Sequence, residues 1–151
     1  MKYTAELKKF DHFLMIMDDQ LESLERLANG FGINISRDAD SFEKLELLFD
    51  MVTEGIDSDA KSEFLVTFGR YLGEIVCETY GGHWTLPLDD PKNVNFNTPV
   101  IKGHSPVETV EFPPISVMHA YSLRKRAGLL RIAVTSQAAP KPLDIDDMEE
   151  K

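Results

Sequence analysis

Apolar residues recur at every third or fourth position in several stretches of this chain, and this spacing predicts amphipathic helices. The first stretch predicts one long helix over residues 4–28. The second predicts a helix that begins near Asp40, which has a capping-box spacing to Glu43, and that ends at Gly55. The apolar stripe of the first helix consists of Leu7, Phe10, Leu14, Met17, Leu21, Leu24 and Leu27 or Ala28.

A third stretch, roughly residues 60–80, predicts a helix that is apolar on nearly every side. Such a helix is buried against more than one neighbour, so it is expected to be the central helix of the domain. The only polar strip is narrow and is expected to face solvent, with Arg70 paired to Glu74 one turn later. This strip consists of Glu63, Thr67, Arg70, Glu74 and Glu78.

Two glycines stand one turn apart inside this predicted helix, at Gly69 and Gly73. Each costs about 1 kcal/mol relative to alanine in a helix interior. We therefore expect a neighbouring element to approach the helix closely at these positions. Gly81 and Gly82 are expected to end the helix.

The hydrophobic period changes after Gly82, and short alternating segments between residues 83 and 112 predict an antiparallel sheet of about three strands with proline-rich edges. Pro113-Pro114 then opens a last helical region. Residues 129–134 fit either a helix or a strand. The sequence therefore predicts an α+β fold, in which N-terminal helices pack with a small antiparallel sheet and a C-terminal helical region. We expect one globular domain over residues 1–137.

Charge is unevenly distributed along the 151 residues, whose formal net charge is -10. Residues 112–143 carry five basic side chains and no acidic one, whereas residues 144–151 carry five acids and one lysine. The overall charge disfavours nucleic acid and anionic membranes and favours a basic protein partner. The composition of residues 138–151 predicts a disordered acidic tail.

No constellation of residues typical of catalysis is present, and we assign no catalytic, cofactor-binding or metal-binding residue. Cys77, the only cysteine, lies on the apolar back of the central helix and is expected to be a buried structural thiol. None of the four histidines has the spacing of a metal pair on one helix face. The candidate partner surface consists of Arg70, Glu74, Glu78, Arg124, Lys125 and Arg126.

The single cysteine, the lack of a signal-peptide pattern at the start of the chain and the absence of a long apolar run predict a cytoplasmic protein. Homo-oligomerisation stays open at this stage.

A local resemblance rests on Phe68-Gly69-Arg70-Tyr71-Leu72-Gly73-Glu74-Ile75 and on Tyr80-Gly81-Gly82-His83-Trp84. This pattern resembles small, acidic bacterial domains of unknown function, some of which resemble immunity proteins encoded beside secreted toxins. The resemblance covers about 20 residues. It implies a bacterial origin, an α+β fold and structural roles for the four glycines and the tryptophan.

The leading hypothesis from the sequence is a non-enzymatic protein-binding domain, immunity- or antitoxin-like, whose acidic surface meets a basic partner. The alternative is a small enzyme or ligand-binding domain with a pocket between the central helix and the sheet.

Overall fold

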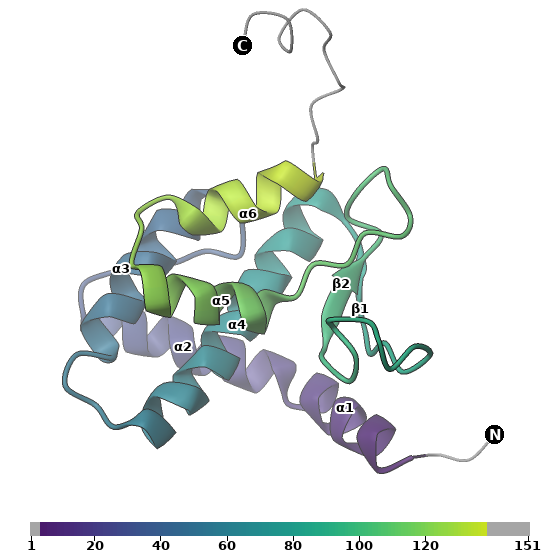
Figure 1. Cartoon of the computed structure of the whole chain (residues 1–151). Coiled ribbons are helices and arrows are strands. Elements are labelled where there is room, and N and C mark those ends of the chain that lie inside the picture. Colours follow the sequence, from purple (N-terminus) through teal and green to yellow (C-terminus); the bar gives the residue numbers. More distant parts are fainter. Residues whose placement is uncertain (1–3, 139–151) are drawn as a thin grey trace, which may run out of the picture.

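One long helix organises the fold, as the sequence predicts (Figure 1). The computed structural model describes residues 4–138, and in it α4 (Ser58–Tyr80) runs through the middle of the protein. It contacts α2 (Met17–Gly30), α3 (Phe42–Val52) and α5 (Pro114–Arg124). Asp57 caps its start by accepting a hydrogen bond from the Ala60 N–H at 2.8 Å. Three packed sides explain why so little of this helix is polar.

The N-terminal segment forms two helices, and the prediction of a single helix over residues 4–28 was wrong. Helix α1 (Ala5–Met15) ends at Ile16, and α2 begins directly after it. Arg70 of α4 donates a hydrogen bond to the Phe13 carbonyl, the acceptor that the Met17 N–H would use in an unbroken helix. A side chain inserted into the hydrogen-bond ladder is a known cause of helix breaks. The buried residue of α1 is Phe13, whereas Leu14 is exposed.

A short 3-10 turn, η1 (Ala39–Ser41), precedes α3. The capping box expected between Asp40 and Glu43 does not form. Asp38 instead accepts the Asp40 N–H at 3.0 Å, and the Glu43 side chain pairs with a distant arginine. The cap therefore begins two residues earlier than the sequence pattern predicts.

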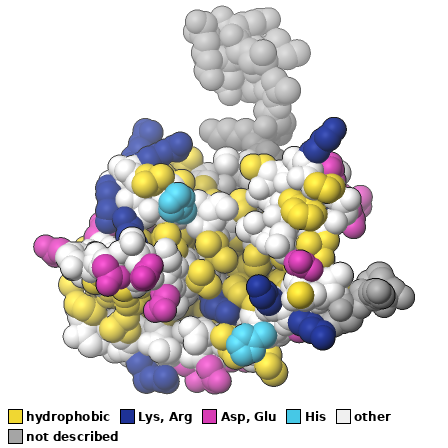
Figure 2. Space-filling view, turned by 60° about the horizontal axis from the view of Figure 1, so that its bottom comes forward, with side chains coloured by type: hydrophobic (Ala, Val, Ile, Leu, Met, Phe, Trp, Pro, Cys, Tyr) yellow, Lys and Arg dark blue, Asp and Glu magenta, His cyan; other side chains and the backbone are white. Residues whose placement is uncertain are grey.

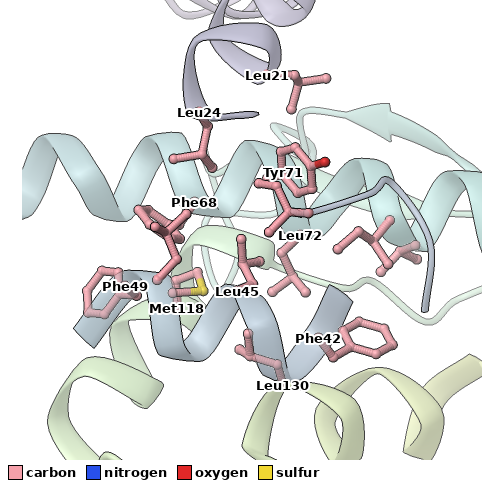
Figure 3. Packing of buried hydrophobic residues seen from close by; sticks show 14 of the residues in the cluster. Leu21, Leu24, Phe42, Leu45, Phe49, Phe68, Tyr71, Leu72, Met118 and Leu130 are labelled. Carbon is pink, nitrogen blue, oxygen red and sulfur yellow. The ribbon is translucent and has the colours of Figure 1, made fainter. Parts of the chain in front are cut away.

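The hydrophobic core lies between α2, α3, α4, α5 and α6 (Leu129–Ala138) (Figure 3). Aromatic rings dominate its centre, where Phe49 contacts Phe68 and Tyr121 edge to face. The largest fully buried side chains are Tyr71, Phe42, Phe49, Phe68, Phe112, Leu21, Leu24, Leu45, Leu48, Leu72, Ile75 and Ile101. The whole buried cluster extends from Phe13 in α1 to Val134 in α6, so both ends of the described chain share one core.

The sheet is smaller than predicted. Within the described residues it has two antiparallel strands, β1 (His83–Thr85) and β2 (Val100–Lys102), with Trp84 opposite Ile101. A single bridge between Ile101 and Phe112 replaces the expected third strand. The residues around 93–95 form turns because Asn93 and Asn95 bond to local backbone and to Glu111. Asparagine side chains that bond locally in this way compete with strand pairing.

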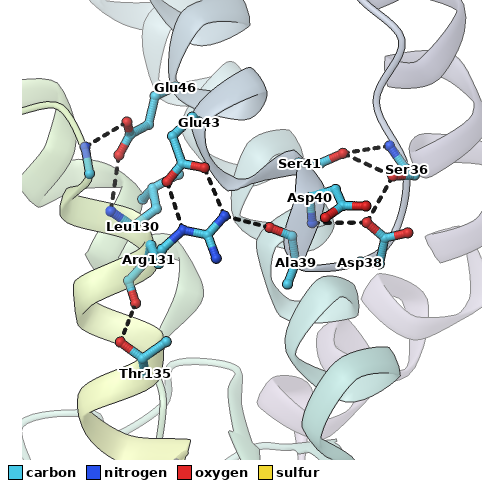
Figure 4. Close-up of polar contacts among 11 residues, drawn as sticks. Ser36, Asp38, Ala39, Asp40, Ser41, Glu43, Glu46, Leu130, Arg131 and Thr135 are labelled. Atoms are coloured by element: carbon cyan, nitrogen blue, oxygen red, sulfur yellow. Dashed lines mark hydrogen bonds and ion pairs between the residues drawn. The ribbon is translucent and has the colours of Figure 1, made fainter.

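Residues 129–134 are helical, which settles the choice between helix and strand. Glu46 of α3, which is 4% exposed, accepts the Gly128 and Leu130 N–H groups at the start of α6, each at 3.0 Å (Figure 4). A carboxylate at a helix N-terminus satisfies free N–H groups and the helix dipole. Helix α6 ends at Ala138, which was expected to open the disordered tail; residues 139–151 lie outside the described part of the chain.

The overall architecture is α+β, as the sequence predicts: helices around α4, a small antiparallel sheet at one end of α4, and two C-terminal helices (Figure 1). Among residues 4–138, no helix combines the length and hydrophobicity that crossing a bilayer requires.

Candidate functional site

An open groove of about 390 Å³ lies between helices α5 and α6. Its two walls come from consecutive helices because Lys125 adopts a left-handed conformation at the end of α5 (φ 51°) and Gly128 has a φ of 87°. These two residues reverse the chain within four positions. The lining is mostly aliphatic and consists of Val117, Ala120, Arg124, Arg126, Leu129, Ile132 and Ala133.

The basic residues around this groove differ in their partners. Lys125 pairs with Asp50 at 2.9 Å, and Arg131 pairs with Glu43 at 2.8 Å (Figure 4). Arg124 and Arg126 form no ion pair within residues 4–138, and both line the groove. Ile132 is 61% exposed in the groove wall, so an apolar side chain shares this surface with Arg124 and Arg126, which have no ion pair to the described part of the chain.

A second pocket of about 340 Å³ opens between α1, α4, the start of α5 and the connection from β1 to β2. Figure 2 shows a hollow on the face that carries α1, with a hydrophobic floor and Lys or Arg side chains beside it. Lys9 and Glu6 are the charged residues of the pocket lining. The remaining lining residues are Ala5, Phe10, Phe13, Val66, Leu86, Asn97, Pro99 and Ile115.

Arg70 lies next to this pocket and not in the solvated strip where the sequence places it. The side chain turns from α4 toward α1, where its guanidinium carbon lies 3.8 Å from the centre of the Phe13 ring. Its described polar contacts are the Phe13 carbonyl and the Met17 sulfur, and no described carboxylate pairs with it. Arg70 is 5% exposed, and burial lowers its pKa to about 10, so at neutral pH it carries a charge that no carboxylate among residues 4–138 compensates by an ion pair.

The expected pair between Arg70 and Glu74 was therefore wrong. Glu74 accepts a hydrogen bond from the Trp84 indole N–H at 2.8 Å. Sequence spacing alone favours the pair, but the approach of α1 draws Arg70 to one side and Trp84 draws Glu74 to the other. Glu78 is exposed on the next turn of α4.

The glycines lie where elements approach closely. A Cβ atom at Gly69 would lie 2.6–3.1 Å from Ile115, and one at Gly73 would lie 2.2 Å from the Trp84 ring. Gly81 ends α4 with a φ of 84°, and a Cβ at Gly82 would lie 2.6 Å from a backbone oxygen of β2. These contacts explain glycine at each position, because side chains would collide or strain the backbone.

The six candidate surface residues do not form one surface. Arg124, Lys125 and Arg126 come together at the end of α5, whereas Arg70, Glu74 and Glu78 lie along α4. Burial and the nearby carboxylates of Glu74 and Glu78 raise the pKa of Cys77 to about 12, which is the behaviour of a structural thiol.

The sequence does not indicate the roles of two buried polar residues. Glu46 has the sequence context of a surface acid, because nothing near it in the sequence identifies the helix start that it caps. His104 is 3% exposed, and its Nε2 lies 3.0 Å from the Gln137 side chain. Within residues 4–138, no three potential ligands from histidine, cysteine, aspartate and glutamate lie close enough to hold a metal ion.

Comparison with known proteins adds no relative: no protein-family model, curated protein or solved structure matches this chain.

Proposed function

We propose that the protein is a non-enzymatic protein-binding domain, and that its α5–α6 groove holds an acidic amphipathic helix of the partner. The observation that carries this proposal is the aliphatic groove with Arg124 and Arg126 in its lining, neither of which has an ion-pair partner within the described residues.

The shape of the groove suits a helix. Two helices joined by a tight reversal leave a trough between them, and amphipathic helices bind such troughs through apolar side chains spaced three and four residues apart. Ile132 is exposed and can contact such side chains. Leu123 of α5 is 70% exposed and adds apolar surface outside the groove lining. Burying these exposed groups supplies the hydrophobic part of the binding energy.

The charges in the groove favour a partner segment of negative charge. The described lining of the groove contains Arg124 and Arg126 and no acidic residue, so it is positive although the whole chain carries -10. At physiological salt the Debye length is about 8 Å, so acidic groups on distant faces are screened more strongly than the two arginines in the groove. An acidic helix therefore fits the groove, whereas a basic partner on the acidic faces stays a prediction of the net charge.

The proposed binding domain acts in the cytoplasm. The immunity- or antitoxin-like role stays a prediction of the sequence resemblance. Under that role the bound helix belongs to a toxin.

A displayed library of helical peptides tests the proposal. Selection on the full chain is expected to enrich peptides with acidic residues on one face and apolar residues on the other. The double variant R124E/R126E is expected to lose these peptides and to select basic ones. The matched control R26E reverses an exposed arginine on α2 and is expected to leave the selection unchanged.

Amide chemical shifts then locate the bound peptide. Perturbations centred on Val117, Leu129 and Ile132 support the proposal. Perturbations elsewhere, or a selection that ignores R124E/R126E, contradict it. A groove that binds no peptide but changes its shifts when residues 139–151 are deleted identifies the chain's own acidic segment as the occupant and also contradicts the proposal.

A further inference from the structure

The pocket beside α1 has the features of a small-molecule site. About 340 Å³ is within the range of ligand pockets, and the lining is mainly aromatic and aliphatic, with few polar groups. Four separate segments of the chain build it. Phe13 and Val66 line it from the helices, and Leu86 and Pro99 line it from the connection between the two strands.

A positive charge lies behind this apolar wall. Phe13 lines the pocket, and the Arg70 guanidinium packs against the Phe13 ring. Arg70 is therefore separated from the pocket by this ring. A buried guanidinium without a carboxylate is costly, because it gives up hydration and gains only a carbonyl, a sulfur and an aromatic ring. An anion held in the adjacent pocket would compensate this charge.

The two charged residues of the pocket lining cancel each other. Lys9 and Glu6 lie one turn apart on α1 and carry opposite charges. Arg70 then supplies the excess charge, and its field acts through apolar side chains, where screening is weak.

We propose that this pocket binds a small amphipathic carboxylate, with its apolar body against Phe13 and Val66 and its carboxylate attracted by Lys9 and Arg70. The inference is independent of the α5–α6 groove, because the two sites share no lining residue although α5 contributes to both.

The protein carries its own reporter for this site. Trp84 is the only tryptophan, and its ring lies 5.0 Å from the Phe13 ring in an edge-to-face contact. Titration of the full chain with sodium octanoate is therefore followed by Trp84 fluorescence. Octan-1-ol and octylammonium serve as neutral and cationic probes with the same chain length.

The expected result is a saturable change in Trp84 emission with octanoate, at an affinity at least about ten-fold above that for octylammonium. Arg70→Met and Lys9→Met are each expected to weaken octanoate several-fold while leaving octanol unchanged. Val66→Phe, which fills the cavity, is expected to abolish both. The control Arg26→Met removes an exposed arginine away from the pocket and is expected to have no effect.

Four results overturn the proposal. The first three are no saturable octanoate binding, equal affinity for octanoate and octylammonium, and octanoate binding that survives Val66→Phe. None of these depends on Arg70→Met, so the test stands even where that variant fails to fold. The fourth is an octanoate affinity that Lys9→Met and a folded Arg70→Met both leave unchanged.

Discussion

Substitution of Gly73 by alanine tests the packing around the central helix. An alanine Cβ would lie 2.2 Å and 2.4 Å from two atoms of the Trp84 ring and 3.1 Å from Pro114. Movement of the Trp84 ring is costly, because its N–H is bonded to Glu74 and the ring makes an edge-to-face contact with Phe13. The methyl group therefore displaces the indole or separates β1 from α4.

Two opposing contributions set the magnitude. Overpacking costs about 1–3 kcal/mol, and loss of a hydrogen bond to a charged group costs about 1.5–3 kcal/mol. Replacing a helical glycine by alanine returns about 1 kcal/mol. The net expectation is a loss of about 3 kcal/mol for Gly73→Ala and more for Gly73→Leu. At about 2–4 °C per kcal/mol, the alanine variant melts roughly 6–12 °C below the parent protein.

Thermal and urea unfolding of four proteins measure this effect: the parent, Gly73→Ala, Trp84→Ala and the double variant. With the indole removed, Gly73→Ala is expected to become neutral or slightly stabilising, since the helix propensity gain then meets less steric opposition. Gly30→Ala is the control, because a Cβ there meets no atom within 4 Å. A Gly73→Ala penalty that persists in the Trp84→Ala background would refute the assigned contact.

Three further predictions concern residues elsewhere in the fold. Glu46→Gln should lower the free energy of unfolding by about 2 kcal/mol in urea titrations, because the start of α6 loses a charged acceptor. A Glu46→Gln variant with the same free energy of unfolding as the parent would contradict the cap. Cys77 is half-buried and its thiol pKa is raised to about 12, so it should react slowly with the thiol reagent DTNB at pH 8 in the native state. It should react at once in guanidinium, where the chain is unfolded. Rapid reaction of the native protein would contradict the raised pKa. The hydrogen bond from Arg131 lowers the pKa of Glu43, so this pair should stabilise the protein above the ordinary glutamate pKa and lose its contribution as the pH falls through the lowered value. In urea titrations, Arg131→Gln should therefore lower the free energy of unfolding by about 1 kcal/mol or less at pH 7. The loss should be smaller near pH 2, where the pair with Glu43 no longer contributes and the bond from Arg131 to the Ala39 carbonyl remains. An equal loss at both pH values would contradict the pair.

Hydrophobic periodicity predicts the elements whose neighbours lie on a fixed face. It places α4 correctly because the helix is apolar around most of its circumference, and no choice of packing face arises. It merges α1 and α2 because the break at Ile16 comes from Arg70, a residue more than 50 positions away. No local signal reports such a contact.

The candidate sites depend even more on distant contacts. Arg124 and Arg126 are visible in the sequence as part of a basic run. The structure is needed to show that Lys125 pairs with Asp50 and Arg131 with Glu43, while the two arginines have no ion pair to any of residues 4–138. The pocket beside α1 joins four segments, so its lining cannot be read from any one of them. Arg70 shows the general difficulty: an exposed i,i+4 pair and a buried cation have the same sequence spacing.

The proposed function depends most directly on whether the α5–α6 groove binds an acidic helix. The decisive measurement is the affinity of one selected acidic peptide for the parent protein, for R124E/R126E and for R26E, by isothermal titration at physiological salt. We predict saturable binding to the parent and to R26E, and a loss of at least about a hundred-fold in R124E/R126E, since each reversal replaces an attraction by a repulsion of similar size. Equal affinity for all three proteins would contradict the proposal that this groove is the binding site.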